Sequence, residues 1–438
     1  MKKETPQLLI SDIKGRIYPN PQLEATGMKG GRFFRLGRAE LIKLPHASRL
    51  FFMPDRAPVA YDTVKGCFTV LDKNPFSRKI TMCFSVAAFT PPGFTVTYNS
   101  SYKEVGNPKI LPLFAYAACA FYKGEFYVAA IKVDSDRRHD SCFINIGEVR
   151  KNVVKFRRLF PHNRLVRHLK RCALNYGCPN AQNFFLSRYE APLPSSPVCN
   201  AGCAGCISYQ TPKRCAATQP RIEFIPTPEE IRDIAVFHIL KSKDPIVSFG
   251  QGCEGEPLLS GDTVEQSIRL IRKETQKGII NINTNASKPR IVSRLFDAGL
   301  NTMRVSMNSV RREYYTRYYK PKGYSFKDVI KSIGAAQGKG GFVSINYLTM
   351  PGFTDSKEEF EALNVFLQRY KVDMVQWRNL NFDPLRYFEE LKAVIPKNRM
   401  LGIRQIMYIL KKNFPDLIMG YFNPSISPAK NYLKKLTY

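Results

Sequence analysis

Three cysteines stand close together near the middle of the chain. Cys199, Cys203 and Cys206 have the spacing CxxxCxxC and share one short loop that contains glycine. Because cysteine thiolates hold iron–sulfur clusters, three of them suit three corners of a cubane cluster and leave its fourth iron without a protein ligand. That iron can chelate the amino and carboxylate groups of a methionine derivative, and an electron from the cluster can then break a carbon–sulfur bond. The spacing therefore indicates radical chemistry carried by a cofactor.

A zinc site is the main alternative for the same loop. Structural zinc takes four protein ligands, usually in CxxC pairs. The loop offers three thiols, and Cys215 is a candidate for the fourth ligand. The spacing alone thus leaves open a zinc ion or a closed four-cysteine cluster, as in a non-catalytic iron–sulfur or zinc protein.

The sequence that follows alternates between strand-like and helix-like patterns. The strand-like runs are Pro245–Phe249, Ile279–Asn283, Thr302–Met307, Gly341–Leu348 and Met374–Trp377. Helical patterns separate them, and units of about thirty residues in this order are typical of βα units around a parallel sheet. We therefore expect an α/β fold whose core is a partial (βα)6-type barrel, preceded by a smaller β-rich domain.

Polar motifs close several of the predicted strands, at the edge where βα folds place their sites. The candidate cofactor-binding residues at these ends are Glu254, Gly255, Glu256, Pro257, Asn285, Ser306 and Asn308. Carboxylate and carbonyl oxygens accept hydrogen bonds from an ammonium group, as the amino end of a methionine derivative requires. Such residues are ordinary in turns, so it is their combination with the three cysteines that predicts a site.

The CxxxCxxC loop, placed before a run of βα units, resembles the radical S-adenosylmethionine (radical SAM) superfamily over about residues 190 to 385. The resemblance implies that Cys199, Cys203 and Cys206 hold a [4Fe-4S] cluster. It further implies an enzyme that cleaves S-adenosylmethionine (SAM) to methionine and a 5′-deoxyadenosyl radical, with an electron donor such as flavodoxin or ferredoxin as a partner.

The resemblance extends to the strand ends. Glu254-Gly255-Glu256-Pro257 is similar to a Gly-Gly-Glu-Pro stretch that meets the methionine amino group in the family. Asn283-Thr284-Asn285 stands where the family often has Thr-Asn-Gly. Ser306 and Asn308 stand where the family often has a residue that faces the ribose or the carboxylate of the cofactor.

The chain departs from the family in two places. Gly205 stands where an aromatic residue usually precedes the last cysteine, and no cysteine follows Cys253. A Cys-rich C-terminal domain, as in some peptide-modifying relatives, is therefore not expected. No motif indicates whether the substrate is a small molecule, a peptide or an RNA.

Four regions are expected along the chain. Short apolar runs such as Arg49–Met53, between Pro, Gly and Asn residues, predict an antiparallel sheet near the N-terminus. The predicted regions are a β-rich N-terminal domain (1–150), a basic helical connector (151–190), the radical SAM core (191–385) and a C-terminal helical extension (386–438).

Basic residues strongly outnumber acidic ones. The chain has 67 Lys and Arg against 36 Asp and Glu, a formal net charge of +31, and a field of this sign attracts polyanions. The densest basic run is Arg150–Arg171, in which Pro161 is expected to interrupt a helix. A solvated basic surface is the simpler interpretation, but a radical-based RNA-modifying enzyme is a second hypothesis, with nucleic acid as a candidate partner.

The remaining cysteines raise the question of a second metal site. Cys172 and Cys178 lie just upstream of the loop and are its first candidates, with Cys142 and Cys215 as further ones. Cys253 lies inside the first strand-end motif. Single cysteines are often simply buried, so both interpretations stay open.

No run of residues is long and apolar enough to span a membrane, and the N-terminus has no apolar signal core. We therefore expect no membrane insertion and a cytoplasmic location. Thiols stay reduced in that compartment, which favours metal ligands over disulfides among the 11 cysteines.

Overall fold

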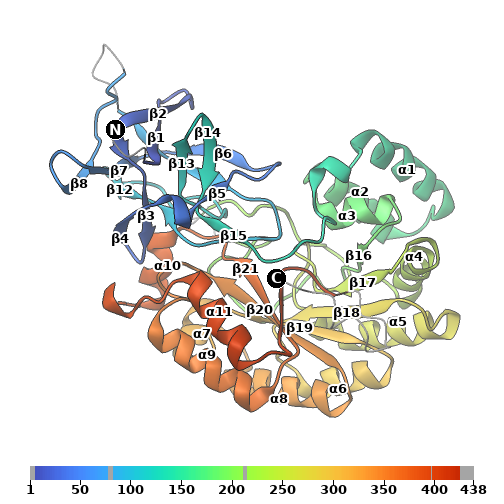
Figure 1. The fold of residues 1–438 in the computed structure, drawn as a ribbon. Helices are drawn as coiled ribbons and strands as arrows, with labels where there is room; N and C mark the ends of the chain where they lie inside the picture. The colour runs from blue at the N-terminus through green and yellow to red at the C-terminus, as the bar shows by residue number, and fades with distance from the viewer. Residues whose placement is uncertain (1–4, 77–81, 211–214, 396, 425–438) are drawn as a thin grey trace.

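The computed structural model describes residues 5–76, 82–210, 215–395 and 397–424. These residues form a β-rich N-terminal part, a group of three helices and a curled parallel sheet with helices on its outer side (Figure 1). The predicted α/β class with a partial barrel and a β-rich N-terminal region is confirmed. The end of the predicted C-terminal extension, 425–438, lies outside the described residues.

The N-terminal part is antiparallel. Its strands are β1 (Gln7–Ser11), β2 (Ile17–Glu24), β3 (Thr26–Lys29), β4 (Arg32–Arg35), β5 (Ile42–Lys43), β6 (Arg49–Met53), β7 (Arg56–Asp62), β8 (Cys67–Val70), β9 (Phe84–Phe89), β10 (Phe94–Val96), β11 (Asn99–Ser100), β12 (Tyr102–Glu104), β13 (Cys119–Tyr122), β14 (Glu125–Val128) and β15 (Ala130–Lys132). Ten of them share one sheet, and β11–β3–β4 and β10–β15 form two smaller sheets. The β13–β14 hairpin turns at Lys123 and Gly124, both with positive φ, as a type I′ turn requires.

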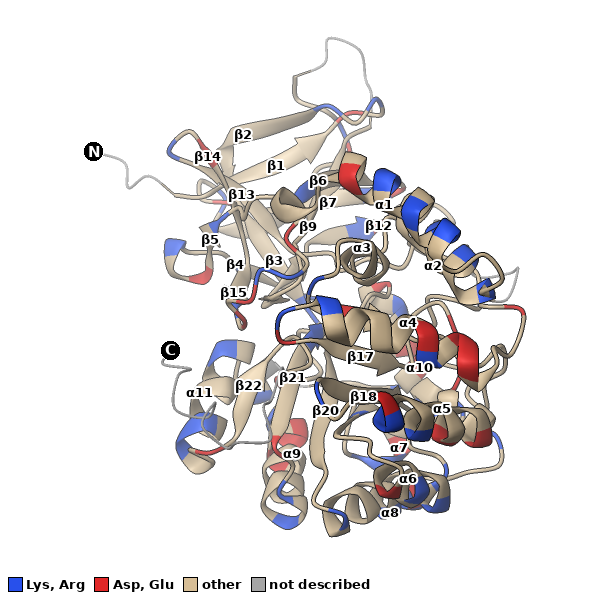
Figure 2. Ribbon diagram, turned by 90° about the vertical axis from the view of Figure 1, so that its right-hand side faces the viewer, with Lys and Arg blue, Asp and Glu red and all other residues tan. Residues whose placement is uncertain are grey.

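A group of three helices follows, here called the helical unit: α1 (Ile146–Leu159), α2 (Arg164–Leu174) and α3 (Pro179–Phe185). Pro161 lies in the break between α1 and α2, as predicted. The apolar face of α1 packs inward through Val149, Val153 and Phe156. Figure 2 shows Lys and Arg gathered along α1 and α2, so the basic run of the sequence forms an outer face of the molecule.

Seven parallel strands make the core sheet, in sequential order. They are β16 (Glu190–Pro192), β17 (Ile246–Phe249), β18 (Ile279–Thr284), β19 (Thr302–Met307), β20 (Phe342–Thr349), β21 (Met374–Asn379) and β22 (Ile418–Gly420). The helices between them are α4 (Pro228–Lys241), α5 (Gly261–Glu274), α6 (Pro289–Asp297), α7 (Arg312–Tyr319), α8 (Phe326–Gly338), α9 (Lys357–Tyr370), α10 (Pro384–Leu391) and α11 (Ile403–Asn413). The 3-10 turns are η1 (Arg38–Glu40), η2 (Ser141–Phe143), η3 (Pro257–Ser260) and η4 (Lys397–Arg399).

The core sheet curls until its two edge strands approach each other. Asn423, just after β22, donates from its side-chain amide to the carboxylate of Glu190 in β16 (2.8 Å). The short strand β22 falls inside the predicted C-terminal extension but pairs with β21. In addition, α1 crosses the predicted boundary at residue 150 and α10 crosses that at residue 385.

Buried polar contacts fix the N-terminal part to the core. Asp383 caps the N-terminus of α10 and also lies 3.4 Å from the guanidinium of Arg56, with both side chains almost fully buried. The amide of Leu111 donates to the same carboxylate (3.2 Å). Lys29 pairs with the buried Asp355 (3.2 Å). Removing one partner of a buried ion pair is strongly destabilising. These pairs therefore hold the N-terminal part against the core.

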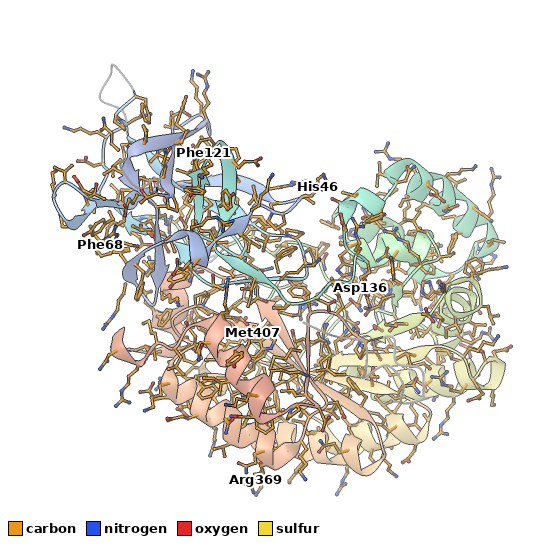
Figure 3. All side chains as sticks on the ribbon, viewed as in Figure 1. His46, Phe68, Phe121, Asp136, Arg369 and Met407 are labelled. Atoms are coloured by element: carbon orange, nitrogen blue, oxygen red, sulfur yellow. The ribbon has the colours of Figure 1, made fainter. Side chains whose placement is uncertain are left out.

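Figure 3 shows where side chains of the two parts lie. Phe68 on β8 and Phe121 on β13 belong to the N-terminal part, whereas Arg369 on α9 and Met407 on α11 belong to the core. No helix in the described part of the chain is long and apolar enough to cross a membrane.

Candidate active site

The cysteine loop, residues 199–206, follows β16 and is held from one side by α7. The amides of Gly202 and Ala204 donate to the carbonyls of Tyr319 and Tyr318 at the end of that helix (2.8 and 3.0 Å). Cys199, Cys203 and Cys206 are each partly buried. The backbone of the loop is thus fixed by hydrogen bonds before any cofactor is considered.

The strand-end motif after β17 holds the loop from the other side. The amides of Gly255 and Glu256 donate to the carbonyls of Ser196 and Val198 (2.7 and 2.8 Å). A Cβ atom on Gly255 would lie 1.9 Å from the carbonyl oxygen of Val198. Only glycine therefore permits this approach of the two segments.

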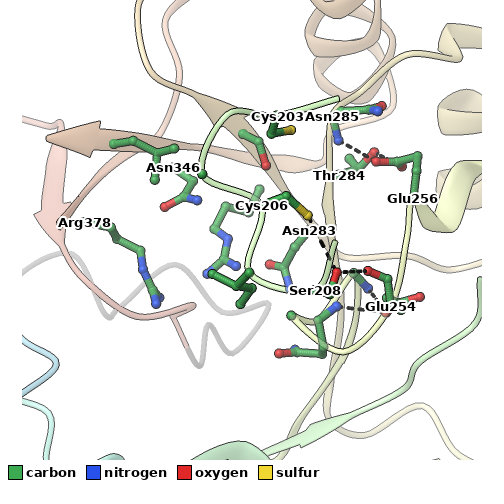
Figure 4. A pocket seen from close by; sticks show the side chains of 18 of the residues that line it. Cys203, Cys206, Ser208, Glu254, Glu256, Asn283, Thr284, Asn285, Asn346 and Arg378 are labelled. Carbon is green, nitrogen blue, oxygen red and sulfur yellow. Dashed lines mark hydrogen bonds between the residues drawn. The ribbon is translucent and has the colours of Figure 1, made fainter. Parts of the chain in front are cut away.

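A cavity of about 360 Å³ opens between the cysteine loop and the carboxyl ends of the core strands. It lies within the usual size range for small-molecule sites. The predicted residues that line it are Cys199, Cys203, Cys206, Glu254, Gly255, Glu256, Asn285 and Ser306. Figure 4 shows Cys203 and Cys206 beside the strand ends, with Glu256 bonded to Thr284 and Asn285.

The carboxylate of Glu254 is already saturated with donors from the protein. One oxygen accepts from the amides of Ser195 and Ser196 (2.7 and 3.2 Å) and from the Ser195 hydroxyl. The other accepts from the amides of Gly250 and Gln251 (2.6 and 2.8 Å). Burial raises the pKa of this carboxyl, and the donated hydrogen bonds lower it. Glu254 therefore ties the segment just before the cysteine loop to the end of β17.

Glu256 makes a similar junction between β17 and β18. Its carboxylate accepts from the amides of Leu258 and Asn285 (3.1 and 2.8 Å) and from the hydroxyl of Thr284. Burial raises the pKa of Glu256 to about 7, against the effect of these donors. The side chain of Asn285 continues the connection by donating to Asn200 in the cysteine loop (2.8 Å).

Two predicted residues do not line the cavity. Pro257 is buried at the start of η3. Asn308 is fully buried and donates to the hydroxyl of Tyr387 (3.1 Å) on α10. Ser306, two residues earlier, does line the cavity. Side chains two residues apart point to the same face only within a strand, and β19 ends at Met307, so Asn308 no longer shares the face of Ser306.

Gly205 stands beside an aromatic residue from another element. A Cβ atom at this position would lie 2.8 Å from the hydroxyl oxygen of Tyr318, and both residues line the cavity. Tyr318 and its neighbour Tyr319 are buried and pack on the barrel. The sequence motif gave no sign that α7 supplies the aromatic ring next to the last cysteine.

Arg221 is a site residue that sequence reasoning missed. One of its terminal nitrogens donates to the sulfur of Cys206 (3.4 Å), and its Nε donates to Ser208 (3.0 Å). Burial raises the pKa of the Cys199 thiol to about 11 and raises the pKa of the Cys203 thiol well above its usual range. Thiolate ligands of a metal are deprotonated outright, and a cation such as Arg221 favours that charged state.

The far end of the cavity carries two partly buried arginines. Arg304 on β19 and Arg378 on β21 have no carboxylate within 4.0 Å among the described residues. Burial, reinforced by the charge of Arg378, lowers the pKa of Arg304 to about 9. Burial lowers the pKa of His139 to about 4.

The other cysteines fall into separate places. Cys172 and Cys253 lie together with His168, while Cys142 lies with His46 and Asp140 on the surface. His46 is on the N-terminal part where it faces the helical unit (Figure 3). Cys178 and Cys215 belong to neither group.

Comparisons with known proteins support one family. Residues 193–363 match the model of the radical SAM superfamily. The sequence matches no curated protein. Members of this superfamily use a [4Fe-4S] cluster and SAM, and the match covers the cysteine loop together with the strands from β17 to β20.

Several solved structures are similar at low identity. They are the FeFe-hydrogenase maturase HydG from Carboxydothermus hydrogenoformans (15% identity, TM-score 0.37, 63% of this chain and 69% of that chain), SuiB of Streptococcus suis bound to S-adenosylmethionine (16%, 0.38, 61% and 62%) and anSMEcpe with bound AdoMet (15%, 0.35, 44% and 52%). The chain thus spans about half of the length of anSMEcpe and less than two thirds of that of SuiB. Residues 193–363 are therefore identified as a radical SAM domain.

Proposed function

We propose that this chain is a radical SAM enzyme in which Cys199, Cys203 and Cys206 hold the [4Fe-4S] cluster. The observation that carries the proposal is that the three thiols and the polar ends of the core strands line one cavity. With cluster and SAM bound, the chemistry supplied is reductive cleavage of SAM to methionine and a 5′-deoxyadenosyl radical. The chain's own residues position the cofactors and enclose the substrate.

The spacing of the thiols supports a cluster over a single ion. Among the described residues, the groups whose ligand atoms all lie within 4.8 Å of one another do not include the three loop cysteines. One zinc ion needs its ligands close together, whereas a cubane gives each cysteine its own iron. The wider arrangement of Cys199, Cys203 and Cys206 therefore fits the cluster.

Unpaired polar atoms in the cavity wall support a bound polar cofactor. The side-chain oxygen of Asn346 and the hydroxyl of Tyr319 are buried without a hydrogen-bond partner in the protein, and both residues line the cavity. Buried polar atoms are normally paired. We assign Asn346 and Ser306 to polar groups of SAM, while Glu254 and Glu256 act by holding the loops that form its site.

The charged far end supports a substrate with an anionic group. Arg304 and Arg378 present two guanidinium groups that bind carboxylate or phosphate well. The nearby acid Glu190 is engaged by Arg138 (3.7 Å) and by Asn423. A carboxylate or phosphate on the substrate would balance this excess positive charge.

An RNA substrate is the second candidate, and the basic faces of α1 and α2 favour it (Figure 2). Phosphate contacts release counterions, so binding would weaken steeply with added salt. A fluorescence titration with a short RNA at several salt concentrations tests this. Binding that does not change with salt removes the RNA hypothesis.

The main test is product analysis. The full chain is purified without oxygen, its cluster is rebuilt and reduced, SAM is added, and 5′-deoxyadenosine is measured by mass spectrometry. We expect the nucleoside from the native chain and from Cys67→Ala, which alters an exposed thiol of the N-terminal sheet. Loss of the nucleoside in Cys203→Ala supports the proposal. An intact, reducible cluster whose spectrum does not change with SAM, and which yields no nucleoside, overturns it.

A further inference from the structure

Three soft ligand atoms meet at the junction of the helical unit and the core. The Nε2 atom of His168 and the sulfur atoms of Cys172 and Cys253 all lie within 4.8 Å of one another. His168 and Cys172 are four residues apart on α2, so they project from the same face of that helix. Cys253 comes from the loop after β17, 81 residues further along the chain than Cys172.

The distances suit a single ion. His168 Nε2 lies 3.5 Å from the sulfur of Cys172. Zinc bonds of about 2.0 Å to nitrogen and about 2.3 Å to sulfur, at the tetrahedral angle, separate the two ligand atoms by about 3.5 Å. The group therefore has the dimensions of a mononuclear site and is tighter than the spread thiols of the cysteine loop.

The surroundings also suit a bound ion. Cys172 and Cys253 are each 2% exposed, whereas His168 is half-buried and lines a shallow cavity with Arg164, Arg167 and Arg221. Imidazole and thiolate are the ligands that zinc prefers. The buried thiols would provide a water-poor interior to the site, and the cavity would provide an entry path for the ion.

We propose that His168, Cys172 and Cys253 bind one zinc ion. The fourth position is open to a solvent molecule from the shallow cavity. Cys178 lies next to this site, because its amide donates to the carbonyl of Cys172 (3.0 Å), but its sulfur is not part of the tight group. The proposal does not rest on the proposed function of the chain.

The ion would join two parts of the molecule. Cys253 directly precedes Glu254, whose carboxylate joins the segment just before the cysteine loop to the end of β17. A zinc bridge from α2 to Cys253 would thus fix the wall of the main cavity to the helical unit. Metal binding at such a junction adds its free energy to that of the fold.

The first experiment measures metal content. The full chain is purified without oxygen, its cluster is rebuilt, weakly bound metal is removed with a brief chelator wash, and zinc and iron are counted by mass spectrometry. We expect about one zinc per chain, and the same in the triple variant Cys199→Ala/Cys203→Ala/Cys206→Ala, which lacks the cluster ligands. Zinc should fall at least about fivefold in Cys172→Ala and in Cys253→Ala. Cys119→Ala, at another buried cysteine, should keep it.

The second measurement does not depend on whether a variant folds. Zinc-edge X-ray absorption of the native chain should show two sulfur ligands and one imidazole. A native chain with an intact cluster but almost no zinc overturns the proposal. An unchanged zinc content in both single variants, or loss of zinc from the triple variant, would also overturn the proposal. So would a ligand shell of three sulfurs without imidazole, or iron in place of zinc on these residues.

Discussion

Two groups of cysteines in this molecule have the same thiol chemistry but differ in how far apart their ligand atoms lie. Cys199, Cys203 and Cys206 belong to one continuous loop, are spread apart and line a cavity. Cys172 and Cys253, with His168, come from distant segments and lie within 4.8 Å of one another. The first arrangement suits a polynuclear cluster that meets a substrate, and the second suits a single metal ion. Ligand spacing, more than ligand type, therefore separates the two sites.

The largest expected effect comes from removing one ligand from each group. Cys203→Ala should abolish 5′-deoxyadenosine formation, because a cluster corner loses its ligand. Cys172→Ala should leave a measurable rate, because it lies outside the main cavity. Rates are measured by mass spectrometry on anaerobically prepared protein, with iron content as a check. Equal loss in both variants, at unchanged iron in Cys172→Ala, would contradict the division of roles.

The next largest effect is expected in the pH dependence of stability, through Glu256 beside the cysteine loop. Burial raises the pKa of Glu256 to about 7 in the folded chain, above the value of about 4.3 expected in the unfolded chain. A raised carboxyl pKa means that the folded chain holds its proton more tightly. Its contribution to stability is full below about pH 4.3 and is lost as the pH rises through 7, in total about 4 kcal/mol.

Urea unfolding of the native chain and of Glu256→Gln across pH 5 to 8 checks this. The glutamine cannot titrate, so the difference between the two free energies of unfolding should shrink as the pH rises. Other titrating groups contribute equally to both proteins and cancel. A difference that does not change with pH would show that Glu256 keeps an ordinary pKa.

Features that lie within one continuous segment of the chain could be predicted from the sequence, whereas contacts between distant segments could not. The core strands were predicted because strand-like runs such as Ile279–Asn283, in which three of the five residues are isoleucine, alternate with helical patterns, as in βα units. The strand Ile418–Gly420 has only three residues and no such pattern, so its pairing with β21 was not foreseen. The lining of the cavity by the cysteine loop followed from one local motif.

Residues that meet only through the fold were out of reach. Arg221 contacts Cys206 from 15 positions away in an irregular segment, and Tyr318 approaches Gly205 from a helix more than a hundred residues later. Cys172 and Cys178 were the first candidates for a second metal site, whereas the tight group joins Cys172 to Cys253 and His168. Sequence spacing indicates partners only within one segment, and tertiary packing chooses the rest.

A smaller effect is expected at the junction of the cysteine loop and α7. Gly205→Ala would place a methyl group 2.8 Å from the hydroxyl of Tyr318. Overpacking of this kind costs about 1–3 kcal/mol of stability. Tyr318→Phe removes the hydroxyl and should recover most of that loss in the double variant. Thermal unfolding of the four proteins gives the coupling energy, and additive effects would mean that the two groups do not touch.

The smallest effect should arise at Arg221, which lies between the two groups of cysteines. It donates to Cys206 (3.4 Å) and also lines the shallow cavity beside His168. Donors and positive charge near a cluster sulfur stabilise the reduced state, so Arg221→Gln should make the reduction potential of the cluster more negative. The rate of 5′-deoxyadenosine formation should fall about tenfold, as changes around metal ligands commonly cause.

A redox titration followed by electron paramagnetic resonance measures the potential, and Arg167→Gln is the matched control because it lines only the shallow cavity. The zinc content should stay the same in both variants, since neither arginine is a ligand of the tight group. A potential that shifts equally in Arg167→Gln would mean that general positive charge, and not the contact with Cys206, sets it. Loss of zinc in Arg221→Gln alone would mean that the two groups of cysteines are coupled through this side chain.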